Sequence, residues 1–166
     1  MNISVIGYSG PIDLPPVSDI RDTCDQVGHL IAEMGHTLFT GGRNGVMEIV
    51  SRSARQAGGT VIGVLPFEED GNPYNNVALK TGMDYKLRSL ILIHSVDLVI
   101  SIGGEIGTLF EIVAAYGYEK DVILFSGTGG VTDRVGAILI DNRYLDNRRL
   151  ASIHSVKSLN ELKSFL

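Results

Sequence analysis

A glycine-rich segment that leads into an expected helix is the feature of this sequence best suited to chemistry. The segment GGEIGT contains Gly103, Gly104, Glu105, Gly107 and Thr108, and it follows a fully apolar run. Glycine inside a regular element costs roughly 0.5–1 kcal/mol relative to alanine, so three glycines so close together indicate backbone with a special task. The start of a helix offers unpaired N–H groups and the positive end of the helix dipole. We therefore predict that a phosphate group binds at this segment.

Glu111, in the helix that follows, has two interpretations. The pattern Thr108-x-x-Glu111 is typical of a capping box, in which the two side chains bond the free N–H groups of a helix start. A carboxylate beside a sugar phosphate is also what cleavage of a glycosidic bond requires, because positive charge develops on the sugar in the transition state. The sequence supports capping and catalysis about equally.

Two arginines could bind the same ligand, and each has a simpler explanation. Arg88 precedes the apolar run and lies one helical turn after Asp84, with which it could form a surface ion pair worth only about 0.2–0.5 kcal/mol. Arg43 lies inside another glycine-rich loop, where it either holds a phosphate through two hydrogen bonds or is solvated.

Three more glycine-rich loops follow other expected strands. They are GYSG, with Gly7, Ser9 and Gly10; GGRNG, with Gly41, Gly42, Arg43 and Gly45; and SGTGG, from Ser126 to Gly130. One such loop would be explained equally well as a tight turn. Four loops at the same edge of one sheet favour a ligand.

The elements that must position these loops alternate between strand and helix. Apolar runs predict strands at Ile3–Ile6, His36–Thr40, Thr60–Leu65, Asp97–Ile102 and Val122–Phe125, with a further strand at Ala137–Ile140. Helical patterns cover Ser18–Met34, Val46–Ala57, Asp84–Ser95, Thr108–Tyr118 and Leu159–Phe165. Strands that are apolar throughout are typical of a parallel sheet covered on both faces. We expect a single Rossmann-like, doubly wound α/β domain over residues 1–166, with a mostly parallel sheet and the ligand at the carboxyl ends of its strands.

The polar segment Pro66–Gly82 is expected to be a long loop beside the ligand edge. Loops of this length in compact domains are often functional, so we predict a lid; an ordered surface connection is the simpler alternative.

Composition excludes several classes of partner. The chain has 166 residues and a formal net charge of −5, and its lysines and arginines do not gather into runs. We therefore expect no nucleic-acid or membrane partner. The four histidines show no ligand spacing and the single cysteine, Cys24, fits a core position, so no metal site is expected. No signal peptide or membrane span is evident, and a cytoplasmic protein is expected.

The common nucleotide-binding signatures are also missing. No G-x-x-x-x-G-K-[ST] occurs, so a P-loop enzyme is not expected. GYSGPI and GTGGVT both fail the G-x-G-x-x-G pattern, and the second strand ends in Thr40 rather than in an acid for ribose hydroxyls, so we do not expect a dehydrogenase.

Taken together, GGRNGVMEIVSRSARQAGGTVIGVLP and IGGEIGTLFE resemble the paired glycine motifs of the LONELY GUY, or lysine-decarboxylase-like, family. GYSGP, GTGGVTD and YLDNRR are similar to the branch that contains the molybdenum cofactor carrier protein. The segment YLDNRR, Tyr144 to Arg149, has a mixed-charge pattern typical of a helix and is explained most simply as a solvated face or a subunit contact. The resemblance covers nearly the whole chain.

The resemblance implies a Rossmann-like fold, a homodimer or a tetramer built on dimers, and a nucleotide-like ligand. Characterised relatives are phosphoribohydrolases, which release the base from a nucleoside 5′-monophosphate. Their catalytic arginine falls on Arg88 and their catalytic glutamate on Glu111. Their phosphate-binding residues fall on the glycines and the threonine of GGEIGT. The chain departs from the motifs at Ile102, Phe110, Ser89 and the pair Tyr85–Lys86.

Two functions follow from the sequence. The first is hydrolysis of the N-glycosidic bond of a nucleoside 5′-monophosphate, for which no cofactor is required. The second is a carrier or sensor that binds a nucleotide or the molybdenum cofactor as its ligand without turnover.

Overall fold

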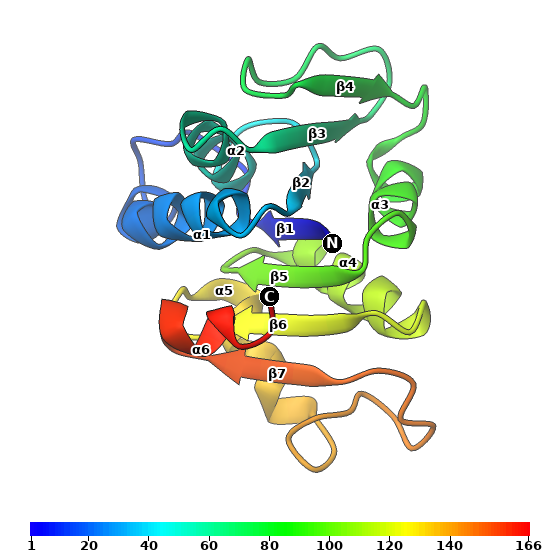
Figure 1. The fold of residues 1–166 in the computed structure, drawn as a ribbon. Helices are drawn as coiled ribbons and strands as arrows, with labels where there is room; N and C mark the ends of the chain where they lie inside the picture. The colour runs from blue at the N-terminus through cyan, green and yellow to red at the C-terminus, as the bar shows by residue number, and fades with distance from the viewer.

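One seven-stranded sheet forms the centre of the computed structural model, which describes residues 1–166 (Figure 1). All six strand pairings are parallel. The spatial order is β4-β3-β2-β1-β5-β6-β7. The strands are β1 (Asn2–Gly7), β2 (Thr37–Thr40), β3 (Thr60–Leu65), β4 (Val77–Lys80), β5 (Leu98–Ile102), β6 (Asp121–Phe125) and β7 (Ile153–Val156).

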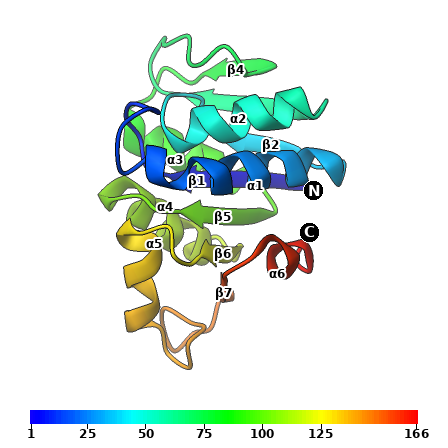
Figure 2. The same ribbon diagram turned by 90° about the vertical axis from the view of Figure 1, so that its left-hand side faces the viewer.

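Helices cover both faces of this sheet (Figures 1 and 2). They are α1 (Arg21–Glu33), α2 (Val46–Gln56), α3 (Tyr85–His94), α4 (Ile106–Gly117), α5 (Gly130–Arg134) and α6 (Leu159–Lys163), with 3₁₀ turns η1 (Ser18–Ile20) and η2 (Val135–Ile138). Two apolar cores result, one under α1, α2 and α6 and the other under α3, α4 and α5. The expected Rossmann-like α/β fold is confirmed.

The apolar strands are buried because both of their faces meet helices. Every residue of β5 is buried, Ser101 included, as a mainly hydrophobic run predicts for a central parallel strand. Cys24 on α1 is fully buried, and burial raises the pKa of its thiol to about 12. It is therefore a core residue, as expected. No helix of the structure is both long enough and apolar enough to cross a lipid bilayer.

The direction in which strands are added reverses between β1 and β5. Strand β1 pairs with β2 on one side and with β5 on the other. Connections that leave these two strands run to opposite sides, so their carboxyl ends open a crevice where ligands bind in doubly wound folds. The loops GYSG and GGEIGT lie at this crevice.

Two edge regions differ from the sequence-based expectation. The segment Pro66–Gly82 contains β4, an edge strand whose four residues are all exposed and whose short apolar run, VAL, lies inside an otherwise polar segment. The strand expected at Ala137–Ile140 is wrong: its first two residues lie in η2, and the last strand is β7, Ile153–Val156. The sequence of β7, IHSV, has two polar residues between its buried ends at the other sheet edge, so it lacks the mainly apolar run of the central strands.

Candidate functional site

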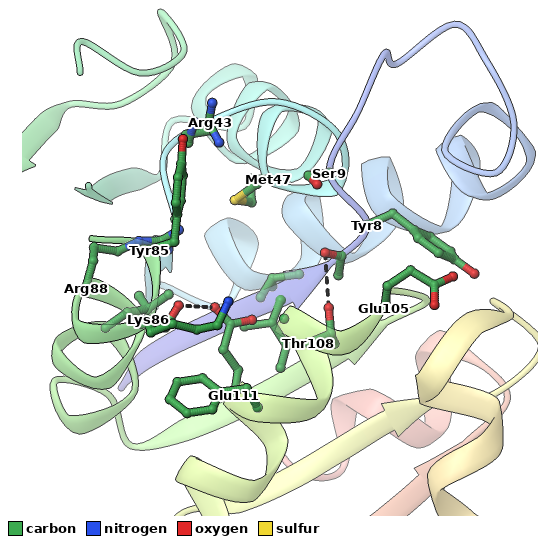
Figure 3. A pocket seen from close by; sticks show the side chains of 18 residues that line it. Tyr8, Ser9, Arg43, Met47, Tyr85, Lys86, Arg88, Glu105, Thr108 and Glu111 are labelled. Carbon is green, nitrogen blue, oxygen red and sulfur yellow. Dashed lines mark hydrogen bonds between the residues drawn. The ribbon is translucent and has the colours of Figure 1, made fainter. Parts of the chain in front are cut away.

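A cavity of about 210 Å³ opens at the carboxyl ends of β1 and β5 (Figure 3). The loops after β1, β2 and β5 and the helices α2, α3 and α4 form its walls. Nine residues predicted from the sequence line it: Gly7, Ser9, Gly41, Arg43, Arg88, Glu105, Gly107, Thr108 and Glu111. The structure therefore brings together both predicted catalytic residues and most of the predicted phosphate-binding residues.

The other predicted glycines lie behind the cavity and shape its loops. They are Gly10, Gly42, Gly45, Gly103 and Gly104, none of which lines the cavity wall. Gly103 and Gly104 both have positive φ angles, of 62° and 92°. A Cβ atom at Gly103 would strike the ring of Tyr8, and one at Gly104 would strike the side chain of Thr108. These two glycines let the loop after β5 turn sharply into α4.

The start of α4 faces the cavity with free N–H groups. The helix begins at Ile106, and its N-cap residue, Glu105, makes no side-chain capping bond. The first N–H groups of an α-helix have no acceptor within the helix, so those of the first turn remain available. The Thr108 hydroxyl instead donates to the carbonyl of Gly7 at 3.2 Å, which ties α4 to β1. Gly107 has open space beside it, so the backbone here is accessible.

Glu111 does not take part in a capping box with Thr108. The helix starts two residues before Thr108, and the Glu111 carboxylate accepts a hydrogen bond from Ser89 Oγ at 2.7 Å. The capping interpretation is therefore wrong, and the carboxylate lies against the cavity. Burial raises the pKa of Glu111, whereas the Ser89 hydrogen bond and the positive charges of Arg88 and Lys86 oppose that rise.

Arg88 is buried at the cavity wall, with only 6% of its surface exposed. The alternative of a surface ion pair is wrong, because Asp84 caps α3 by accepting from the N–H groups of Lys86 and Leu87. The Arg88 guanidinium lies against Gly41, where a Cβ atom would collide with it. Its Nε atom is buried without a hydrogen-bond partner, and burial lowers the pKa of the side chain. A buried cation with unused donors is well suited to an anionic ligand.

Arg43 closes one end of the cavity. Its Nε lies 2.6 Å from Glu69 Oε2, and its guanidinium stacks 5.0 Å from the centre of the Tyr85 ring. The Tyr85 hydroxyl donates to Glu69 Oε1 at 3.1 Å, and the ring of Phe67 packs edge-on against Tyr85. Arg43 is therefore neither simply solvated nor free for a phosphate in this arrangement.

The segment expected to act as a lid is anchored to the loop after β2. The Asn72 N–H and the Asn75 side-chain amide both donate to the carbonyl of Gly42, and the Asn72 side-chain amide donates to that of Arg43. These bonds favour the alternative of an ordered connection. Closure of the lid on a ligand stays a prediction, tested by hydrogen exchange over Asp70–Asn76.

The glycine-rich loop after β6 is closed by its own side chains. The Asp133 carboxylate accepts from the N–H groups of Gly127 and Gly129, both at 2.8 Å. Thr128 and Thr132 bond the backbone of Gly103. The fourth loop therefore supports GGEIGT and offers no free site of its own.

The start of α2 is also partly closed. The Val46 N–H donates to the Tyr8 carbonyl at 2.9 Å, and the Gly10 N–H donates to the Asn44 side chain at 3.2 Å. Among the helices that follow glycine-rich loops, α4 therefore has the most accessible start.

Several cavity residues were not predicted from the sequence. They include Tyr8, Met47, Tyr85, Lys86, Ser89 and Phe110. The signal that could have identified four of them is the departure of the chain from the family motifs, which occurs at Tyr85, Lys86, Ser89 and Phe110. Tyr8 stands inside GYSG, but its type gave no reason to prefer it over its neighbours. The described residues contain no cluster of three His, Cys, Asp or Glu residues that could bind a metal.

The segment Tyr144–Arg149 is a turn and not a helix. Ion pairs hold it, between Arg148 and Asp146 at 2.6 Å and between Arg149 and Asp141 at 2.7 Å. The Tyr116 hydroxyl contacts Asp146 as well, at 3.1 Å. Its charges are used locally, which agrees with a solvated surface segment.

The fold and the cavity define a Rossmann-like α/β protein whose pocket lies at the topological switch point of the sheet. The chain belongs to the SLOG cluster4 family, whose model matches residues 1–161.

Solved structures of similar proteins cover almost the whole chain. It is 52% identical to TM1055, with a TM-score of 0.97 over 99% of this chain and 96% of the other. It is 31% identical to the molybdenum cofactor binding protein of the phototrophic bacterium Rippkaea orientalis, with a TM-score of 0.78 over 99% and 96%. It is 27% identical to the molybdenum cofactor carrier protein of Chlamydomonas reinhardtii, with a TM-score of 0.80 over 99% and 94%. This similarity supports a ligand-binding role, and the expected family resemblance is confirmed.

Proposed function

We propose that the protein binds a phosphorylated, nucleotide-like small molecule at the start of α4. The observation that carries this proposal is the free first turn of α4, which faces the same cavity as the buried and incompletely bonded Arg88. Helix N-termini stabilise anions through both their N–H groups and their dipole. A guanidinium adds charge-assisted hydrogen bonds, which are about twice as strong as neutral ones.

The size of the cavity indicates which part of the ligand it holds. Pockets that enclose whole drug-sized ligands measure about 300–1,000 Å³, whereas this cavity measures about 210 Å³. We infer that it holds the phosphate and the group attached to it. The ring system of the ligand would then extend toward the exposed Tyr85 at the rim.

Within this ligand class, a molybdenum cofactor is the first candidate. Two structural neighbours are named for binding or carrying that cofactor. The cofactor is a pterin that bears a phosphate monoester, and the α4 start and Arg88 fit that phosphate end. A carrier function requires binding and release alone.

Hydrolysis of a nucleoside 5′-monophosphate is a second candidate, favoured by the carboxylate of Glu111 on the cavity wall beside Arg88. In this reaction the oxygen of water bonds to C1′ of the ribose and the C1′–N bond breaks. The electron pair of that bond and a proton go to the base, which leaves ribose 5-phosphate. Glu111 would stabilise the developing positive charge or accept the proton of the water, and Arg88 would orient the substrate.

Native mass spectrometry of the purified protein tests the binding function. We expect a bound phosphorylated species whose signal is lost in Arg88→Met protein. Protein that carries no such species and binds neither AMP nor molybdenum cofactor in calorimetry would contradict the proposal.

Glu111→Gln separates the two candidates. A hydrolase should lose roughly 10²–10⁴-fold in release of free base, the usual range for a positioned acid–base group. A carrier should release no base with either Glu or Gln, while its affinity for AMP holds or increases. Wild-type protein that binds nucleoside monophosphates but releases no base across a broad panel would exclude the hydrolase.

Assembly as a homodimer or tetramer is also part of the proposal. The surface of α4 supports it, because Ile106 and Val113 are 74% and 50% exposed. We expect light scattering to give a mass of two or four times 17.9 kDa, and a mass of one chain would contradict this assembly. A cytoplasmic location stays a prediction.

A further inference from the structure

A single hydrogen bond controls the carboxylate of Glu111. Ser89 on α3 is buried, with 6% of its surface exposed, and its Oγ donates to Glu111 Oε1 on α4 at 2.7 Å. It is the only hydrogen bond made by the Glu111 side chain, which takes part in no ion pair within 4.0 Å. Its second oxygen, Oε2, is left without a protein partner.

The packing of α3 explains why a hydroxyl, and not a cation, holds this carboxylate. Arg88 and Ser89 are neighbours on α3, and both line the cavity. The Arg88 side chain extends to Gly41 in the loop after β2, where its guanidinium fits only because that residue lacks a Cβ atom. Ser89 is left to meet α4. The Arg88 guanidinium thus forms no ion pair with Glu111, and the Ser89 hydroxyl bonds the carboxylate instead; a dashed line marks this bond beside Glu111 in Figure 3.

The bond influences both the orientation and the charge of Glu111. A hydroxyl that donates to a carboxylate oxygen favours the ionised form. The charged groups that line the cavity with Glu111 are Lys86 and Arg88 from α3, Arg43 from the loop after β2, and Glu105 at the start of α4. Of these, Arg88 and Lys86 act on the Glu111 carboxylate. Burial raises the pKa of Glu111, and the Ser89 bond is the largest influence in the opposite direction. Removing the bond therefore shifts Glu111 toward the neutral form.

We propose that Ser89 is a positioning residue that fixes the orientation of Glu111 and keeps its carboxylate ionised beside the ligand. For the ligand, this inference rests on the proposed function. A negative Glu111 opposes a bound phosphate, so affinity for AMP should increase as Glu111 takes up a proton. Ser89 would then set the pH at which the site changes from weaker to stronger anion binding.

Carbon-13 NMR of the side-chain carboxyl groups tests the inference without any ligand. In glutamate-labelled protein, the Glu111 resonance is assigned as the one that is missing from the spectrum of the Glu111→Gln variant. We expect Ser89→Ala to raise its titration midpoint by about one pH unit, the size expected for a lost hydrogen bond to a charged group. Ser89→Thr keeps the donor and should restore most of the wild-type midpoint. Ser95→Ala is the matched control, because the Ser95 hydroxyl bonds the Ile91 carbonyl at the end of α3.

A midpoint that is the same in Ser89→Ala and wild-type protein overturns the inference. If Ser89→Ala does not fold, Ser89→Cys, whose thiol is a weaker donor, should shift the midpoint in the same direction. Calorimetry with AMP between pH 4 and pH 8 then tests the consequence for binding. A shifted midpoint in protein that does not bind AMP would contradict the proposed function and leave the role of Ser89 intact.

Discussion

Helices α4 and α5 both start after glycine-rich loops at the same edge of the sheet, and of these two starts only that of α4 is free. At α5, the Asp133 carboxylate accepts from the N–H groups of Gly127 and Gly129. At α4, the N-cap residue Glu105 makes no capping bond with its side chain. The N–H groups before α5 are thus bonded without a ligand, whereas those at the start of α4 remain free.

The difference depends on one side chain rather than on the glycines. Asp133 is the fourth residue after the N-cap Gly129, and Leu109 is the fourth residue after the N-cap Glu105. A carboxylate at that position folds back onto the loop, and a leucine cannot. A glycine-rich turn before a helix therefore indicates an anion site only when no nearby side chain bonds its N–H groups.

The largest effect is expected at the buried arginine. Arg88→Met should lower the affinity for AMP by about 10–100-fold, because it removes charge-assisted hydrogen bonds to the phosphate. Arg134→Met is the matched control, because this arginine is the last residue of α5, is exposed and pairs with Glu105 at 3.2 Å. We expect that control to change affinity by less than about threefold, as is usual for surface ion pairs. Equal losses of affinity in calorimetry would contradict a specific role for the buried arginine.

A steric change at the α4 start should have the next largest effect. Gly107→Val should weaken AMP binding by about tenfold, because its side chain would fill open space where the phosphate approaches. The φ angle of Gly107 is not positive, so no backbone strain is expected, contrary to what the glycine itself suggests. Gly117→Val, at the other end of the same helix and also beside open space, should leave affinity unchanged. Loss of binding in both variants would point to damage of the helix as a whole.

Removing the Asp133 carboxylate at the start of α5 should affect the stability of the protein more than its affinity for AMP. Asp133→Ala removes two hydrogen bonds at a helix N-terminus and should lower the free energy of unfolding by about 1 kcal/mol. That change lowers the melting temperature by about 2–4 °C in a chain of this size. Asp133→Asn keeps an acceptor oxygen and should therefore lower the melting temperature by less than Asp133→Ala. An unchanged melting temperature for Asp133→Ala would show that the carboxylate does not close the loop.

The smallest effect is expected in the pH dependence of stability. Because burial raises the pKa of Glu111 above its unfolded value, ionisation of this residue destabilises the folded state. The cost is absent below the unfolded pKa and develops as the pH rises through the folded pKa. Glu111→Gln should therefore gain stability relative to wild type as the pH rises from 4 to 8 in urea unfolding. A constant difference would contradict a raised pKa.

Much of this architecture could be predicted from the sequence because its central strands are apolar throughout. The switch point also follows from the order of elements, since it places GYSG and GGEIGT at one crevice. The edge strands β4 and β7 escaped prediction because each has only four residues: β4 lies inside a polar segment, and β7 has two polar residues between its buried ends. The sequence could not decide whether Glu111 caps the helix or serves catalysis. The contact that argues against capping is its hydrogen bond from Ser89, which lies 22 residues away in the sequence.

Titration of nitrogen-15-labelled protein with AMP tests the central claim most directly, because it reports on both helix starts at once. The account predicts that the amide resonances of Ile106, Gly107 and Thr108 shift saturably, while those of Gly127 and Gly129 stay in place. In Arg88→Met protein the same shifts should require about 10–100-fold more AMP. Saturable shifts at Gly127 and Gly129 with none at the start of α4 would contradict the account.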